Sequence, residues 1–261
     1  MIFLRVNDDR AYLLDEILDL IESRPWLGID LAFYGDLNFS SAQRLRLSGL
    51  CGTKKSFHLN HECYTAQDLI LNSSHGALRG FSRDVSLAHK FNLTNAVLHW
   101  AYDLKNRMPS IRQMQDVLSI FEQAEIVPHI ENLAWDFDSH EELINTAILS
   151  QMEFGVCFDI GHAKLWGGKP FSVWLDWLTL LDNMGISLTF HIHGNYGERD
   201  NHLPLFTCDE GGDFAPRGMT WVFQSLLQTF PKSSFVLETK TESAILNARW
   251  IEEKFLADVE R

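Results

Sequence analysis

Residues 155–163 read GVCFDIGHA: an apolar run ends in Asp159, and His162 follows three residues later. Short apolar runs that contain β-branched and aromatic residues are typical of buried parallel strands. A polar residue at the end of such a strand, before a longer amphipathic segment, is typical of one βα unit. The rest of the chain repeats this pattern, so the fold is predicted by counting the repeats.

Eight short apolar runs alternate with eight segments that have helical periodicity. The predicted strands are residues 2–6, 28–33, 56–59, 96–99, 126–130, 155–159, 187–193 and 234–238. The predicted helices are residues 12–23, 42–50, 78–91, 111–123, 140–149, 171–183, 219–230 and 242–255. The average of about 33 residues per unit matches an α/β chain folded as a (β/α)8 TIM barrel. We therefore expect residues 1–261 to form a single TIM-barrel domain.

Local signals agree with this prediction. The alternative, a doubly wound open sheet, would be expected to show a Gly-rich turn after an early strand, and none is visible. Hydroxyl side chains at helix starts predict N-caps at Ser40 or Ser41, at Ser110, and at Ser139, which is followed by two glutamates.

The amino-acid composition restricts the classes of partner and ligand that this protein can bind. Thirty-five acidic and 22 basic side chains give a net charge of −13, which argues against duplex nucleic acid or an anionic membrane as the main partner. Eleven histidines in an acidic protein suggest bound cations. Neither a signal peptide nor a membrane span is visible, and cysteines 51, 63, 157 and 208 lack CxxC spacing. We expect a cytoplasmic protein with free thiols.

Polar side chains end six consecutive predicted strands, where a TIM barrel builds its active site. They are His58, His99, Glu131, Asp159, His191 and Glu238, and the loop after the seventh strand adds Asp200 and His202. Any one of them alone is explained as a hydrogen-bonded core residue or a helix cap. Six together are costly to bury unless a metal or mutual hydrogen bonds compensate them. Imidazole and carboxylate ligands without cysteine favour Zn, Mn, Fe or Co over Ca or Mg.

These motifs resemble the xylose-isomerase-like TIM-barrel superfamily, which includes sugar and sugar-phosphate isomerases and epimerases and the endonuclease IV phosphodiester hydrolases. The resemblance spans nearly the whole chain. It rests most specifically on GVCFDIGHA, on FHIHGN followed by RDNH, on the EN after strand five, and on the ET after strand eight.

The resemblance implies two different metal sites. An isomerase would hold one ion with Glu131, Asp159, His191 and Glu238, and the two glutamates would move protons. The endonuclease IV pattern implies three ions. The first would use His58, His99 and Glu131; the second Glu131, Asp159, His191 and Glu238; the third His162, Asp200 and His202. All nine positions are filled here.

The complete set favours a metal-dependent hydrolase of a phosphoester in a small molecule or nucleotide, with two or three divalent ions, Zn, Mn or Fe. The alternatives are a one-metal sugar or sugar-phosphate isomerase or epimerase, and a non-catalytic barrel that binds a ligand. Expected catalytic residues are Glu131, Glu238 and His162. Expected substrate-binding residues are Trp100, Trp135, Trp166, Arg199 and His193. His193 has no ligand position in the resemblance: it either orients a neighbouring ligand or points outward.

Two departures limit the resemblance. Relatives commonly have Asp at the position of Gly194, which puts a contact near the metal in doubt. The loops also lack the basic and intercalating residues that bending duplex DNA requires. We therefore expect a small phosphorylated or sugar-containing substrate, no duplex DNA and no membrane; the oligomeric state stays open. The short HIHG motif also resembles cobamide-remodelling phosphodiesterases of this superfamily.

Overall fold

The computed structural model describes residues 1–7, 12–32, 39–71, 75–104, 107–207 and 211–256. Eight parallel strands pair in sequence order, and the last pairs with the first, so the barrel closes. The strands are β1 (Ile2–Asn7), β2 (Leu27–Ala32), β3 (Lys55–His58), β4 (Asn95–Leu98), β5 (Val127–Glu131), β6 (Gly155–Asp159), β7 (Ser187–Ile192) and β8 (Ser234–Leu237). The predicted TIM barrel is confirmed.

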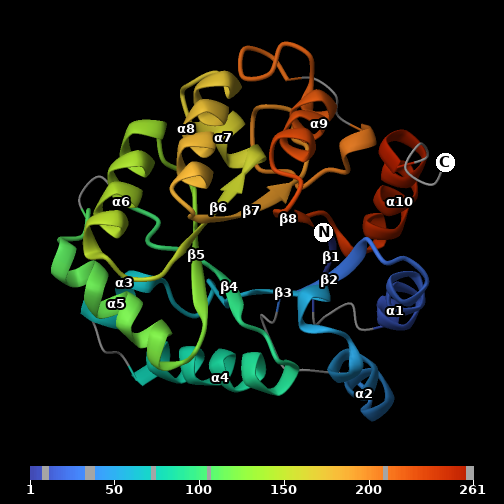
Figure 1. Cartoon of the computed structure of the whole chain (residues 1–261), viewed down its shortest axis with the longest axis horizontal. Coiled ribbons are helices and arrows are strands. Elements are labelled where there is room, and N and C mark those ends of the chain that lie inside the picture. The colour runs from blue at the N-terminus through green and yellow to red at the C-terminus, as the bar shows by residue number, and fades with distance from the viewer. Residues whose placement is uncertain (8–11, 33–38, 72–74, 105–106, 208–210, 257–261) are drawn as a thin grey trace.

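Helices surround the strands (Figure 1). They are α1 (Leu14–Ser23), α2 (Ser41–Gly49), α3 (Ala66–Leu71), α4 (His75–Phe91), α5 (Ile111–Gln123), α6 (Phe137–Ser150), α7 (Ile160–Trp166), α8 (Phe171–Asn183), α9 (Met219–Thr229) and α10 (Thr241–Ile251). A π-helical turn, Glu252–Leu256, follows α10. The eight predicted helices are confirmed. The sequence missed α3 and α7, because six or seven residues are too few to show a helical period.

The predicted helix caps are partly confirmed. Ser40 and Ser110 each accept a hydrogen bond from the backbone N–H three residues on and form complete capping boxes. The prediction for Ser139 is wrong. The helix begins earlier, at Phe137, and Asp136 is the N-cap that accepts from the Ser139 N–H. An aspartate accepts this bond as well as a serine does, so sequence alone did not separate the two.

The strands are buried on both faces, as expected for a parallel sheet covered by helices. Charged side chains are also buried within the strands of this apolar barrel, among them Arg5 on β1, which is 3% exposed, and Asp30 on β2, which is fully buried. They are direct neighbours in the strand register. This pair lies within the barrel and becomes part of the site described below.

Other expectations concern membranes and cysteines. None of the helices in the described part of the chain is both long enough and apolar enough to cross a membrane. Cys51, Cys63 and Cys157 are free thiols. Cys208 lies outside the described residues.

Candidate metal centre

The carboxyl ends of β3 to β8 bring the nine predicted metal ligands to one mouth of the barrel. Glu131, at the end of β5, lies at the centre of them and is 1% exposed. One of its oxygens, Oε2, is 3.3 Å from Nε2 of His58 and 3.0 Å from Nε2 of His99. Its other oxygen, Oε1, is 3.1 Å from Nδ1 of His191. The two oxygens therefore face two different groups of imidazoles.

A second group of ligands surrounds His191. Glu131, Asp159, His191 and Glu238 each place one donor atom within 4.8 Å of the others. The shortest contact joins Nδ1 of His191 to Oε2 of Glu238, at 2.7 Å. These four residues come from four consecutive strand ends, β5 to β8. They are the complete ligand set that the resemblance implies for a one-metal site.

A third group lies beside the second. His162, His193, Asp200 and His202 also place donor atoms within 4.8 Å of one another. Asp200 Oδ2 is 2.7 Å from Nε2 of His202 and 3.3 Å from Nε2 of His162. The side chain of Asp159 caps α7 by accepting from the backbone N–H of His162. Through this cap, Asp159 and His162 connect the second and third groups.

The loop after β7 is held in place by its own backbone. Gly194 and Leu203 exchange two hydrogen bonds, at 2.7 and 2.8 Å, and form an isolated antiparallel bridge. The bridge brings Asp200 and His202 back over the barrel mouth. His202 has a φ of 48°, a conformation that non-glycine residues adopt rarely and that often marks functional sites.

The tautomers of three histidines test whether the site fits a cation. The Nδ1 atoms of His58, His162 and His202 lie 2.7, 2.8 and 2.9 Å from backbone carbonyls, which only accept hydrogen bonds. Each Nδ1 must therefore carry the proton. In the neutral ring, Nε2 then has a free lone pair and acts as an acceptor or a metal ligand. These Nε2 atoms face carboxylate oxygens, so a proton or a metal ion must lie between them. Backbone carbonyls orient metal-binding histidines in the same way, so the donor set fits divalent ions.

The electrostatics of the site favour cations. Burial opposes a charge on His162, but Asp159, Asp200 and Glu131 outweigh it and raise the pKa of His162 to about 10. Burial likewise opposes charge on Glu131, yet His191 and His99 hold the pKa of Glu131 well below its usual range. Glu131 thus stays ionised, and the carboxylates around His162 attract either a proton or a metal ion to its ring.

His193 points inward. It is fully buried, and its Nε2 lies 3.0 Å from both carboxylate oxygens of Asp159. Gly161, on α7, makes room for it, because a Cβ at Gly161 would lie 2.0 Å from the His193 ring. Of the two positions left open by the sequence, inward or outward, the ring has the inward one, in contact with the predicted ligand Asp159.

Several residues of this mouth were not predicted, among them His61, Arg5 and Asp30. His61 stacks on His99, with ring centroids 4.3 Å apart. One ring nitrogen from each of His58, His61 and His99 lies within 4.8 Å of the other two, so the three form a further set of possible metal ligands. The sequence signal for His61 is SFHLNH, in which His61 follows His58 by the same three residues that separate Asp159 from His162. Arg5 contacts Asp30 and Glu238, and its Nη2 donates to Nε2 of His191 at 3.3 Å.

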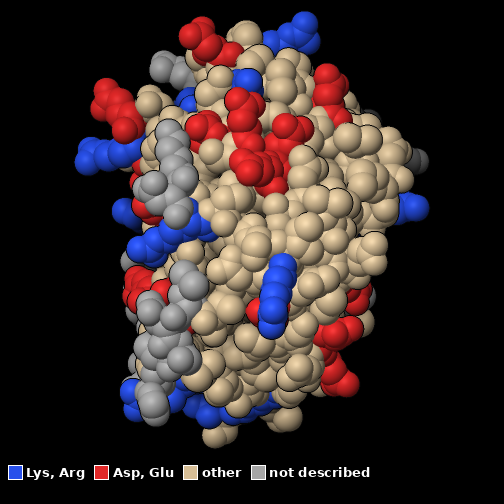
Figure 2. Space-filling view, turned by 90° about the vertical axis from the view of Figure 1, so that its left-hand side faces the viewer, with Lys and Arg blue, Asp and Glu red and all other residues tan. Residues whose placement is uncertain are grey.

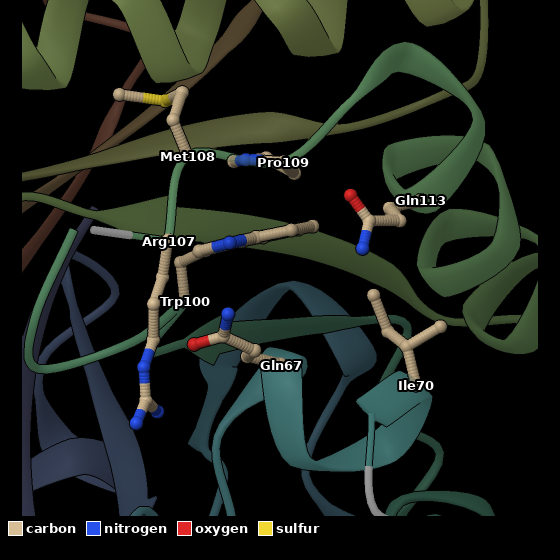
Figure 3. A pocket seen from close by; sticks show the side chains of 7 residues that line it. All are labelled: Gln67, Ile70, Trp100, Arg107, Met108, Pro109 and Gln113. Atoms are coloured by element: carbon tan, nitrogen blue, oxygen red, sulfur yellow. The ribbon is translucent and has the colours of Figure 1, made fainter. Parts of the chain in front are cut away.

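The three predicted tryptophans lie in different surroundings. Trp166 is 40% exposed, and its ring centroid is 5.3 Å from that of His162. Trp135 is 6% exposed and lines a cavity together with Trp166. Trp100 differs from the expectation: it is fully buried and lines a separate cavity between α3 and α5, beside Gln67 (Figure 3). The backbone N–H of Gln67 donates a hydrogen bond to the carbonyl of Trp100, so the start of α3 is held against the segment that follows β4.

The predicted Arg199 and three other basic side chains near the mouth differ in their positions. Arg199 is exposed on the loop next to Asp200. Lys164 donates to the backbone carbonyl of Asn195, and Arg217 lies over the ring of Trp221. Lys240 lines a cavity at the mouth together with Arg5 and Glu238.

Comparisons with known proteins show which solved structures share this fold. Neither a scan of protein-family models nor a search of curated proteins finds a match. Solved structures do match. The TTHB071 protein from Thermus thermophilus, in a structure soaked with ZnCl2, is 19% identical, with a TM-score of 0.67 over 97% of this chain and 98% of that one. A xylose isomerase domain protein from Planctomyces limnophilus is 12% identical, with a TM-score of 0.63 over 97% and 95%.

This chain shares its barrel fold with proteins named as xylose isomerase domain proteins. An AP endonuclease, family 2, from Brucella melitensis has this fold as well; it is 13% identical, with a TM-score of 0.53 over 97% of this chain and 98% of that chain. At these identities the likeness shows the fold alone. The resemblance expected from the motifs is confirmed at the level of the fold. Most of the similar solved structures are named as enzymes or enzyme domains.

Proposed function

We propose that this protein is a metal-dependent hydrolase of a phosphoester in a small molecule or nucleotide. The observation that carries the proposal is the third ligand group, His162, Asp200 and His202, which lies next to the four-residue set of a one-metal isomerase. A second supporting observation is Glu131, whose two oxygens face imidazoles of two different groups.

In this proposal the ligands divide into the three sites implied by the resemblance, with Glu131 shared between the first two. Two or three divalent ions would be held, with Zn, Mn or Fe best suited to these imidazole and carboxylate donors. When bound, such ions lower the pKa of water and stabilise negative charge on phosphate oxygens. The zinc named for the Thermus thermophilus structure supports zinc as the first ion to test.

Three residues of this chain are proposed as catalytic. Glu131 holds two ligand groups together and lies on the floor of the mouth. Glu238 lines the same cavity and, in this proposal, would hold both a metal ion and the attacking water. His162, also on this cavity and beside Asp200, would help to hold an ion close to the leaving group of a bound ester.

The expected substrate is small. The central cavity has a volume of about 240 Å³, and the cavity beside Lys240 about 350 Å³. On the face shown in Figure 2, acidic side chains gather near the top, while most Lys and Arg side chains lie toward the edges. The net charge of −13 supports a compact anion held by metal ions more than a duplex held by a basic surface. A cytoplasmic location is part of the same proposal.

The test compares two reactions on protein loaded with Zn²⁺ or Mn²⁺. Hydrolysis of bis-p-nitrophenyl phosphate is expected, and conversion within a panel of ketoses and ketose phosphates is not. His202→Ala should abolish the hydrolysis, whereas His89→Ala, which removes a histidine on α4 outside the mouth, should retain it. Conversion of a ketose with no phosphodiester hydrolysis would contradict the proposal.

The runner-up is a sugar or sugar-phosphate isomerase or epimerase. Its supporting observation is the complete set of Glu131, Asp159, His191 and Glu238 within one group. In that reaction the two glutamates would move the proton next to the carbonyl. Glu131→Gln removes a residue needed by both reactions, so this variant does not separate them.

A further inference from the structure

Three adjoining cavities form a cleft across the barrel mouth. The central one is lined by the candidate ligands. It adjoins the cavity of about 350 Å³ through three shared residues: His61, His202 and Glu238. On the other side it adjoins a cavity of about 240 Å³ through three others: Tyr102, Ala134 and Trp166. A substrate whose phosphorus lies at the centre can therefore extend to either side.

The side that contains Trp166 is an aromatic cavity, lined by Tyr102, Trp135 and Trp166. Trp166 is 40% exposed and Tyr102 is 56% exposed, so both rings present surface to a ligand. Aromatic side chains stack on flat ring systems, and nucleobases use this contact without needing a particular base. Trp166 also contacts His162, so a stacked ring would lie directly beside the ligand groups.

The polar atoms of the aromatic cavity favour a heterocycle over a plain hydrocarbon ring. The Nε1–H of Trp135 is buried and has no hydrogen-bond partner among the described residues. Asp103 and Asp136 line the same cavity, and an ionised carboxylate, even one that caps a helix as Asp136 does, can accept several hydrogen bonds. A flat ring that carries both an acceptor and N–H donors matches these groups, and a nucleobase-like heterocycle has both.

The opposite side of the cleft has a different chemistry. Its described lining residues include no Trp, Tyr or Phe. The side-chain oxygens of Asn7 and Asn201 are buried there without hydrogen-bond partners in the described structure, and Lys240 lies beside them. Amide oxygens accept from hydroxyl groups, so this side suits a hydroxylated group. A flat ring therefore has one preferred place in the cleft.

We propose that the substrate carries a nucleobase-like heterocycle, which binds in the aromatic cavity and stacks on Trp166. The proposal rests on the proposed function, because it places the ring relative to a phosphate at the ligand groups. It adds the substrate class, a phosphoester of a nucleoside or a similar heterocyclic compound.

The experiment measures binding without turnover. Isothermal titration calorimetry compares adenosine 5′-monophosphate with ribose 5-phosphate on the zinc-loaded protein. The two ligands share the phosphate and the ribose, so the difference between them reports the base. We expect adenosine 5′-monophosphate to bind about tenfold more tightly, which is within the range of base stacking on an aromatic side chain.

Variants locate the contact. Trp166→Leu should remove most of the preference for the base, and Trp166→Phe should keep much of it because the ring remains. Trp26→Leu is the matched control, since Trp26 precedes β2 at the other end of the barrel. Equal affinity for the two ligands in the unmodified protein would overturn the proposal, as would a preference that survives Trp166→Leu or the absence of binding by either ligand. Failure of the proposed function is seen separately, as no hydrolysis of bis-p-nitrophenyl phosphate while the base preference persists.

Discussion

In the interior of the barrel, Nε of Arg5 lies 2.7 Å from Oδ2 of Asp30, and both side chains are almost completely buried. The same guanidinium contacts Glu238 and His191, which belong to the candidate metal centre. The pair therefore connects β1 and β2, which carry no predicted ligand, to the ligands on β7 and β8.

The Arg5–Asp30 pair predicts a strong effect on stability. Arg5→Met should lower the free energy of unfolding of the metal-free protein by about 3 kcal/mol or more, because Asp30 is then a buried charge without its partner. The double variant Arg5→Met, Asp30→Asn should recover part of this loss, since the unpaired charge of Asp30 is gone while Glu238 still lacks its contact with Arg5. Urea unfolding monitored by circular dichroism measures both. An equal loss in the single and double variants would contradict the role of the pair.

The contact between His193 and Asp159 predicts an effect on metal binding. Gly161→Ala places a methyl group where the His193 ring lies, so the ring must move away from Asp159. Loss of such a contact behind a ligand lowers metal affinity by about 10 to 100-fold. Competition with a fluorescent zinc chelator measures the change.

Two comparisons sharpen this result. His193→Ala should lower zinc affinity by a similar factor, because it removes the same contact. Gly49→Ala is the control, since a Cβ there meets no atom within 4 Å. Unchanged zinc affinity in both Gly161→Ala and His193→Ala would show that His193 does not support the site.

Buried His140 predicts sensitivity to acid. Its ring is fully buried beside Trp135, Trp174 and Trp177, and neither nitrogen has a hydrogen-bond partner among the described residues. Burial lowers the pKa of His140 to about 3. Below pH 6.5, His140 binds a proton in the unfolded chain but stays neutral in the folded protein. The free energy of unfolding therefore falls by about 1.4 kcal/mol per pH unit because of this group.

His140→Phe removes that titration while keeping an apolar ring. Relative to its own stability at pH 7, the variant should lose about 3 kcal/mol less than the unmodified protein on acidification to pH 4. Urea unfolding across this pH range is the measurement. Parallel stability curves for the two proteins would contradict the prediction.

The ligand groups predict how variants change the metal content. Replacing His58 and His99 together by Ala should remove one equivalent of zinc, and replacing His162 and His202 together should remove another. The reason is that these pairs belong to different groups of donors. Inductively coupled plasma mass spectrometry after dialysis counts the zinc. If both double variants lose the same single equivalent, the groups form one site.

The barrel and the ring of ligands were predictable from sequence because each depends on one strand at a time. A buried strand followed by a polar residue is visible locally, and eight repeats determine the closure. Asp159 and His162 were found in this way. Their neighbour His193 was visible too, but its direction depends on the space left by Gly161, which lies on another element.

The missed residues depend on contacts between distant strands. Arg5 and Asp30 are plain charges within apolar runs, and their place in the site follows only when β1 closes against β8. Trp100 was predicted to lie in the site, and here too a contact with a separate element decided its actual position. Its position after β4 suggests the mouth, but α3, which is too short to show a period, bonds to the backbone there and covers it.

The most direct test of the multinuclear centre is anomalous diffraction from zinc-loaded crystals, which counts and places the ions. The account predicts two or three peaks, including one at His58, His99 and Glu131 and one at His162, Asp200 and His202. A single peak at Glu131, Asp159, His191 and Glu238, with the other imidazoles uncoordinated, would contradict it and favour the isomerase.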